Sequence, residues 1–316
     1  MTLAVEARGL TKRFGERLAV DTVDLSIEPA DVYGYLGPNG AGKTTSLRMM
    51  VGLISPTAGE ARLFGRDPHL EGARALDGVA GFVEAPRFYP YLSARKNLEL
   101  CAAFDGGEAR SRIDAALDTV DLSDRARDRV GSYSHGMNQR LGIAAALLRA
   151  PRLLILDEPT TGLDPAGMRD MRALVKRLAA EGITVLLSSH QLAEVEEICN
   201  RVAIIRTGRI LYEGPLDGLL KASRPPYRLV TADRDRTLAL ASARGLVAHA
   251  ADGEAVLVEA DEPAMLELTV ELGRNGVGIR EMLVERPTLE QLFFELVEDG
   301  HGPSIASAPA PVAEPV

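Results

Sequence analysis

The stretch DVYGYLGPNGAGKTTSLRMMVGL, residues 31–53, indicates the class of fold. Its first residues form an apolar run typical of a buried strand, and its last residues are typical of a helix. Between them GPNGAGKTT, residues 37–45, has the spacing G-x-x-x-x-G-K-[ST] of a phosphate-binding loop. A glycine turn that arose by chance would not need a strand before it and a helix after it. We therefore predict a phosphate site here.

Every position of this loop is expected to contact a nucleoside triphosphate. Glycine lets backbone N–H groups approach phosphate oxygens, and the Lys43 ammonium is predicted to reach the β- and γ-phosphates. The Thr44 hydroxyl is the predicted ligand of a Mg²⁺ ion. The predicted nucleotide-binding residues of the loop are Gly37, Pro38, Asn39, Gly40, Ala41, Gly42, Lys43, Thr44 and Thr45.

A second apolar run, in LLILDEPTTGLDP at residues 153–165, is predicted to be a buried strand that ends in two carboxylates. Asp157 would lie at the carboxyl edge of the sheet, where it can hold the Mg²⁺ shell. Glu158 is then placed to act as general base on an attacking water. Taken alone, the pattern also fits a strand followed by a solvated acidic turn, but the phosphate loop favours the catalytic interpretation.

His190 ends a third buried run, TVLLSSH. A lone histidine is more often structural than functional. Here a third strand end would bring it to the same edge of the sheet and toward the γ-phosphate, so we predict a catalytic role beside Lys43 and Glu158.

Strands alternate with helices over most of the chain, which predicts an α/β fold around a mainly parallel sheet. Residues 4–28 alternate as short antiparallel strands do, and a helical subdomain is expected at about residues 85–150. We expect one domain at 1–223 and a smaller α+β domain at 224–299, whose element order resembles a ferredoxin-like βαββαβ unit followed by a helix. The Pro- and Ala-rich residues 300–316 are expected to be disordered.

Composition limits the class of protein. A formal net charge of −9 argues against a general nucleic-acid binder, and two cysteines provide no disulfide framework. The N-terminus is too short and too charged for a signal peptide, and no apolar run approaches the roughly 20 residues that cross a bilayer. We expect a soluble protein of a reducing compartment.

The stretch YSHGM, residues 133–137, predicts a helix start that suits an anion. Ser134 is a good N-cap, whereas Gly136 weakens a first turn by about 1 kcal/mol relative to alanine. The free N–H groups and partial positive charge of a first turn favour a negatively charged ligand. Gly136 would let that ligand approach the backbone closely.

With these motifs in this order, residues 4–220 resemble the ATP-binding subunit of an ABC transporter. Phe14 stands where that family has an aromatic that stacks on adenine. GPNGAGKTT corresponds to its Walker A loop, LLILDE to its Walker B strand, TGLD with Asp164 to its D-loop, and YSHGM to its signature. The resemblance implies an ATPase that uses ATP and Mg²⁺ and pairs head to tail. Ser134 and Gly136 would then act on the nucleotide of a partner domain, and Asp164 is a further expected nucleotide-binding residue.

Three positions depart from the family pattern. His135 and Met137 replace a glycine and the glutamine of the signature, and Glu84 in GFVEAP replaces a glutamine at a subdomain joint. The resemblance makes Glu84 a third residue near the metal, with Thr44 and Asp157. Glu84, the segment FYPYLSARKNL, YSHGM and PTLEQLFFEL together resemble the drug and antibiotic export branch, which includes bacitracin- and daunorubicin-resistance pumps.

The resemblance implies an ATPase subunit that dimerises on ATP and powers export of a drug, antibiotic or lipid-like substrate through a separate transmembrane permease. It would form a homodimer, or a heterodimer with a related ATPase subunit, at the cytoplasmic face of the membrane. The aromatic-rich segment 85–103 is expected to dock the permease. Two alternatives stay open: a P-loop kinase, which has no use for YSHGM or TGLD, and a non-transport ABC-type ATPase of translation or DNA repair.

Overall fold

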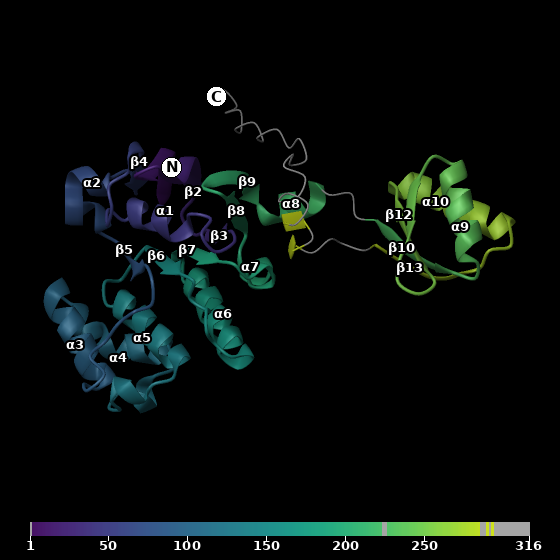
Figure 1. Ribbon diagram of the computed structural model, residues 1–316. Coiled ribbons are helices and arrows are strands. Elements are labelled where there is room, and N and C mark those ends of the chain that lie inside the picture. The colour runs from purple at the N-terminus through teal and green to yellow at the C-terminus, as the bar shows by residue number, and fades with distance from the viewer. Residues whose placement is uncertain (1, 223–225, 285–288, 291, 294–316) are drawn as a thin grey trace, which may run out of the picture. The chain divides into compact units, whose positions relative to one another are not determined.

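The strand before the phosphate loop is central in a six-stranded sheet of the computed structural model, which describes residues 2–222, 226–284, 289–290 and 292–293 (Figure 1). The strand order is β5-β6-β7-β3-β8-β9, and only β9 runs antiparallel to its neighbour. This arrangement confirms the predicted α/β fold. The strands are β3 (Val32–Leu36), β5 (Val79–Phe82), β6 (Leu153–Asp157), β7 (Thr184–Ser189), β8 (Arg201–Arg206) and β9 (Arg209–Pro215).

The register of the parallel strands brings three strand ends to one edge. Leu36 of β3 pairs with Ser189 of β7, and Ser188 of β7 pairs with Asp157 of β6. Because parallel strands end on the same side, the segments that follow β3, β6 and β7 meet there. The phosphate loop, the carboxylates of Asp157 and Glu158, and His190 therefore lie at these strand ends.

A smaller antiparallel sheet has the order β2-β1-β4. Residues 4–28 supply β1 (Val5–Phe14) and β2 (Arg17–Ile27), as their alternation predicts. The sequence does not predict β4 (Ala58–Leu63), because its only buried side chains are those of Ala61 and Leu63. Pairing with β1 supplies the backbone hydrogen bonds that a short strand needs.

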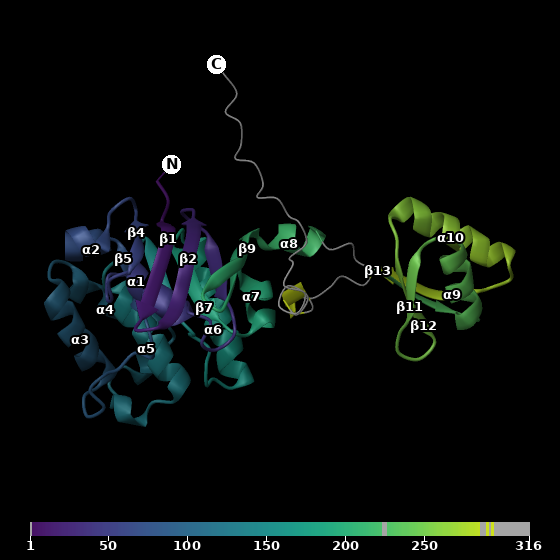
Figure 2. The same cartoon turned by 45° about the horizontal axis from the view of Figure 1, so that its top comes forward.

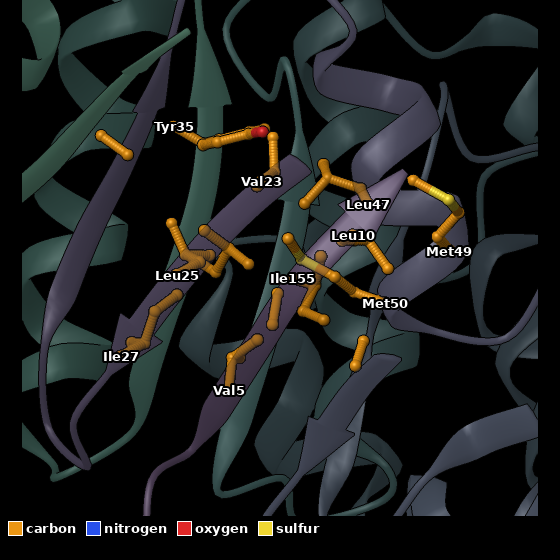
Figure 3. Close-up of a cluster of buried hydrophobic side chains, with 14 of the residues drawn as sticks. Val5, Leu10, Val23, Leu25, Ile27, Tyr35, Leu47, Met49, Met50 and Ile155 are labelled. Carbon is orange, nitrogen blue, oxygen red and sulfur yellow. The ribbon is translucent and has the colours of Figure 1, made fainter. Parts of the chain in front are cut away.

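The main core lies where α1 (Lys43–Met50) packs between the two sheets (Figure 3). Leu47 and Met50 of α1 are fully buried next to Leu10 of the antiparallel sheet and Ile155 of the parallel sheet. Burying side chains of this size contributes about 1.5–3 kcal/mol each. The helix that carries Lys43 is therefore fixed on two sides.

On the opposite face of β3, α7 (Leu192–Ile198) approaches closely. A Cβ at Gly34 would lie 2.6 Å from Val195 Cγ1, so only glycine allows this contact. The other helices of this unit are α2 (Pro68–Glu71), α3 (Ala94–Asp105), α4 (Ile113–Thr119), α5 (His135–Leu147) and α6 (Pro165–Ala180), with 3-10 turns at Gly72–Leu76, Ala109–Arg112, Ser123–Arg125 and Val130–Ser132. Helices α3, α4 and α5 group together in both views, as predicted for the helical subdomain (Figures 1 and 2).

The chain divides into two compact units at Leu216/Asp217. The boundary that the sequence predicts, near Arg224, lies outside the described residues, as does the tail 300–316. Helix α8 (Leu216–Ala222) precedes a sheet of order β11-β12-β10-β13 that is antiparallel throughout. That order is the ferredoxin-like arrangement the sequence predicts. Its elements are β10 (Tyr227–Thr231), α9 (Arg234–Ala243), β11 (Val247–Ala250), β12 (Ala255–Glu259), α10 (Glu262–Arg274) and β13 (Ile279–Val284).

One buried cluster joins both helices of this unit to its sheet. It includes Leu229 of β10, Val256 of β12, Ala241 of α9 and Leu268 of α10. Of the helix that the sequence predicts from Leu289 onward, only residues 289–290 and 292–293 are described.

Candidate active site

The phosphate loop turns sharply between β3 and α1. Gly42, the N-cap of α1, has a φ of 110°, and a Cβ there would lie 2.7 Å from the carbonyl oxygen of Ala19. At Gly37 a Cβ would lie 2.3 Å from the carbonyl oxygen of Ile205. Both positions therefore require glycine. The turn ends at the N-terminus of α1, where free N–H groups suit a phosphate.

A cavity of about 280 Å³ opens above this loop. Among the described residues, its lining includes Lys43 and Thr44 from the loop, Glu158 from the end of β6, and His190 from the end of β7. The structure thus brings together residues that are up to 147 positions apart, as the strand register requires. The other lining residues are Arg17, Ala19, Pro38, Asn39, Gly40, Gly42, Thr45 and Thr161.

Glu158 is the centre of a hydrogen-bonded network in this cavity. Its Oε1 lies 3.0 Å from Lys43 Nζ, and its Oε2 lies 2.6 Å from His190 Nδ1. The Thr161 hydroxyl donates to the same Oε2 at 2.9 Å. Burial by itself raises the pKa of Glu158, but the contacts with Lys43, His190 and Thr161 outweigh it, so its pKa is below the ordinary value. Glu158 is therefore held as a carboxylate, the form that can accept a proton.

Lys43 is buried and has a second partner besides Glu158. Its Nζ donates to the carbonyl oxygen of Gly37 at 2.7 Å. The ammonium is thus held directly over the loop. A bound phosphate would compete with Glu158 for this ammonium.

Asp157 is buried next to this network. Its Oδ1 accepts a hydrogen bond from the Ser188 hydroxyl at 2.5 Å, and its Oδ2 accepts one from the backbone N–H of Glu84 at 3.3 Å. The Ser188 hydroxyl in turn accepts the backbone N–H of Glu158 at 2.9 Å. Ser188 therefore fixes both carboxylate-bearing residues, although no sequence motif predicted a role for it.

Glu84 contacts this network only through its backbone. Its carboxylate is exposed and forms an ion pair with Arg48 of α1. Its φ of 74° places it in the left-handed region, which is uncommon for a residue with a side chain. The joint segment, GFVEAP at residues 81–86, thus contacts Asp157 through the backbone N–H of Glu84, while the Glu84 side chain pairs with α1.

Phe14 lies at the end of β1, where it pairs with Arg17 of β2. Its ring is half exposed, and Lys12 Nζ lies 5.1 Å from the ring centroid. Since Arg17 lines the cavity, Phe14 lies next to a lining residue.

Ser134, Gly136 and Asp164 form a separate group. Ser134 caps α5 by accepting the N–H of Met137 at 3.2 Å, as predicted, and Asp164 caps α6 by accepting the N–H of Gly167 at 2.8 Å. A Cβ at Gly136 would lie 3.4 Å from Leu163 Cδ2, so the start of α5 packs on TGLD. None of the three is among the described residues that line the cavity.

Sequence reasoning assigned no role to Ser188 or Arg17, and it considered Thr161 only as the first residue of TGLD. Each is an ordinary polar residue that reaches the site only because the chain folds as it does. The only available signal was position, because Thr161 follows Glu158 by three residues and Ser188 precedes His190 by two.

Comparisons with known proteins agree with this geometry. A family model described as ABC transporter matches residues 20–161. The bacitracin transport ATP-binding protein BcrA of Bacillus licheniformis is 36% identical over 311 residues, 95% of this chain and 99% of the relative. The daunorubicin resistance ATP-binding protein DrrA3 of Streptomyces coeruleorubidus is 34% identical over 307 residues, 94% and 96% of the two chains.

Solved structures show the same relationship. The structure of an ATP-binding subunit of an ABC transporter matches with a TM-score of 0.62 and 29% identity, over 70% of this chain and 92% of that chain. An ATP-binding cassette in a dimeric, post-hydrolysis state bound to ADP and Pi matches with a TM-score of 0.60 and 27% identity, over 67% and 98%.

A phosphate loop and a carboxylate pair at one edge of a mainly parallel sheet are what a P-loop ATPase requires. The chain belongs to the family of ATP-binding subunits of ABC transporters, and it is an ATPase that binds ATP. Across the described ranges, no helix is both long enough and apolar enough to span a bilayer.

Proposed function

We propose that this subunit dimerises on ATP and powers export of a drug, antibiotic or lipid-like substrate through a separate permease. The observation that carries the proposal is the contact of Glu158 with both Lys43 and His190 inside the phosphate-loop cavity. The names of the two relatives, which refer to bacitracin transport and daunorubicin resistance, support the substrate class.

In the proposed mechanism the backbone N–H groups of residues 37–45 bind the triphosphate, and Lys43 compensates its charge. Glu158 accepts the proton of the attacking water, while His190 holds the Oε2 side of the carboxylate and contacts the γ-phosphate. A general base of this kind contributes about 10²–10⁴-fold to a rate.

The residues present fit a Mg²⁺ ion. Thr44 offers a hydroxyl and Asp157 a carboxylate, and Mg²⁺ prefers one or two such oxygen ligands together with phosphates and waters. When bound, the ion would neutralise phosphate charge. Glu84 is a third proposed contributor, which requires its carboxylate to leave Arg48.

We further infer that a second ATPase subunit completes the nucleotide site. Ser134, Gly136 and Asp164 would contact a nucleotide held in the partner's cavity, and Phe14 would stack on the adenine of its own. Their grouping around the start of α5, apart from the cavity lining, supports this division. A similar cassette was solved as a dimer bound to ADP and Pi, which also supports it. The partner is an identical or a related subunit.

The proposed permease contact is a groove beside the joint segment. It measures about 420 Å³, and its lining includes Phe82, Pro86, Phe88 and Cys101. Tyr89 and Tyr91 follow directly and are exposed, with ring centroids 5.8 Å apart. Aromatic side chains next to an apolar groove are typical of a protein interface. This contact would place the subunit at the cytoplasmic face of a membrane.

Affinity purification of the tagged subunit from its native membranes tests the export proposal. We expect a polytopic membrane protein to co-purify, and the double variant Tyr89→Ala/Tyr91→Ala to lose it while retaining ATPase activity. Exposed Leu70 lies on α2 and is not among the described residues that line the groove, so Leu70→Ala is a control. Co-purification of ribosomal or DNA-repair components instead of a membrane protein would favour the non-transport alternative.

A further inference from the structure

A buried carboxylate lies behind the cavity and has no part in the mechanism above. Glu194 of α7 is only 3% exposed. Its Oε2 accepts hydrogen bonds from the Thr160 hydroxyl at 2.7 Å and from the Ser189 hydroxyl at 3.1 Å. Both hydroxyl residues are also buried, so the two hydroxyls and Glu194 Oε2 satisfy one another.

The two hydroxyls belong to the two segments that hold Glu158. Thr160 precedes Thr161, whose hydroxyl donates to Glu158 Oε2 at 2.9 Å. Ser189 precedes His190, whose Nδ1 lies 2.6 Å from the same oxygen. Ser189 also accepts the N–H of Gln191 at 2.9 Å, which fixes the turn after β7. Glu158 Oε2 contacts Thr161 and His190, and Glu194 holds the residue that precedes each of them.

We propose that Glu194 is a positioning residue for ATP hydrolysis: by accepting hydrogen bonds from Thr160 and Ser189, it sets the distance between the segment after β6 and the end of β7, and so fixes Glu158 Oε2 against His190. This inference rests on the proposed role of Glu158 as base. A misplacement of about 1 Å at a reacting group reduces a rate by about 10²-fold.

Glu194 acts here as a hydrogen-bond acceptor, and its negative charge is not required. Burial raises the pKa of Glu194, and the hydrogen bonds from Thr160 and Ser189 lower it only in part. A buried charge is thus unfavourable at this position, whereas an acceptor oxygen is required. A glutamine, which keeps an acceptor oxygen at the same reach, should therefore perform the task, and an alanine should not.

The test compares Glu194→Ala, Glu194→Gln and the control Glu197→Gln in the full chain. Glu197 lies on the same helix but forms ion pairs with Arg172 and Lys176 on α6. The readouts are single-turnover ATP hydrolysis and the Kd of the fluorescent analogue MANT-ATP. We expect Glu194→Ala to lose about 10- to 100-fold in turnover with its Kd within about twofold of wild type. Glu194→Gln and Glu197→Gln should stay within about threefold in both.

Three results would overturn the proposal. Wild-type turnover in Glu194→Ala would show that the clamp is dispensable. An equal loss of turnover and affinity would indicate general damage, and a Glu194→Gln as slow as Glu194→Ala would assign the effect to charge. If Glu194→Ala does not fold, Thr160→Val and Ser189→Ala each remove one of the two hydrogen bonds. We expect each to slow turnover severalfold at unchanged Kd, and unchanged turnover in both would reject the clamp.

Glu158→Gln separates failure of this inference from failure of the mechanism. Inactive Glu158→Gln with a normal Glu194→Ala rejects only the positioning role. A fully active Glu158→Gln rejects the base itself.

Discussion

Polar side chains at the carboxyl edge of the six-stranded sheet and at the start of α5 differ in burial and in the number of their partners. At the sheet edge Glu158 is mostly buried, and its two oxygens contact three side chains, those of Lys43, His190 and Thr161. At the start of α5, Ser134 is exposed and its hydroxyl accepts one capping hydrogen bond. The first region has its geometry fixed within one chain, whereas the second offers helix N–H groups that have no partner inside the helix.

This difference indicates how the work is divided. Groups that must be placed to a fraction of an ångström for the chemical step are held by packing and by neighbouring side chains. In the proposed dimer, groups that recognise a ligand arriving with another subunit are left accessible. Four predictions test or refine this contrast, from the largest expected effect to the smallest.

Replacing Glu158, the proposed base, should have the largest effect. Glu158→Gln keeps the shape of the side chain but cannot accept the proton, so we expect hydrolysis to fall by about 10²–10⁴-fold with ATP binding retained. Lys43→Ala should lose binding as well, because the phosphate charge is no longer compensated. Single-turnover hydrolysis and MANT-ATP titration separate the two effects. Normal binding and turnover in Lys43→Ala would mean that the cavity is not the nucleotide site.

The start of α5 should act on the other subunit's nucleotide. Ser134→Arg and Lys43→Ala are each expected to be inactive as homodimers. A linked dimer of the two has one intact composite site, since the Lys43→Ala half offers a good α5 to the loop of the Ser134→Arg half. We expect its ATPase activity to match that of a linked dimer of wild type and Lys43→Ala to within about twofold.

Ser132→Arg, on the exposed turn two residues upstream, is the matched control and should leave the homodimer active. Inactivity of the linked mutant pair, alongside an active linked control with one wild-type half, would contradict the trans arrangement.

The pH dependence of stability should change in Glu194→Gln. Because the folded-state pKa of Glu194 is raised above its ordinary value of 4.5, the folded protein binds this proton more tightly than the unfolded chain does. Its contribution to stability is complete below that value and is lost as pH rises through the folded-state pKa. Glutamine does not titrate and has no such loss, so the Tm of Glu194→Gln should increase relative to that of wild type as pH rises. Each kcal/mol of difference in the free energy of unfolding corresponds to about 2–4 °C in Tm.

Differential scanning fluorimetry from pH 4 to pH 9 measures the Tm difference between Glu194→Gln and wild type. This range begins near the ordinary pKa of glutamate and extends well above it. Glu197→Gln, at an exposed site with a lowered pKa, should show no gain toward high pH. A Tm difference for Glu194→Gln that is constant with pH would contradict the raised pKa.

Removing the second unit should have the smallest effect, which we expect to see in the affinity for the nucleotide. A stop at Ser223 leaves residues 1–222, which include the whole unit Met1–Leu216 with the phosphate loop and every described residue lining the cavity. We expect MANT-ATP affinity to stay within about twofold of wild type. Loss of binding would mean that the unit Asp217–Val316 supports the site.

The sequence determined the parts of the protein that depend on local pattern. The spacing of GPNGAGKTT requires glycine at two close backbone approaches, and the order of strand, loop and helix fixes the class of fold. The apolar run ending in Asp157 and Glu158 predicts a buried parallel strand, because only such a strand has both faces covered. The same reasoning found the N-cap at Ser134 and the ferredoxin-like order of the second unit.

Only the tertiary structure decided which side chains meet. The register of β3, β6 and β7 sets Glu158 against Lys43 and His190, and it gives Ser188, Thr161 and Glu194 their partners. Strand register depends on how α1 and α7 pack against both faces of the sheet, which no short stretch of sequence records. For the same reason no sequence pattern predicts that the carboxylate of Glu84, which the resemblance places near the metal, pairs with Arg48. A side chain's position in sequence fixes where its backbone lies, whereas its partners are set by what packs around it.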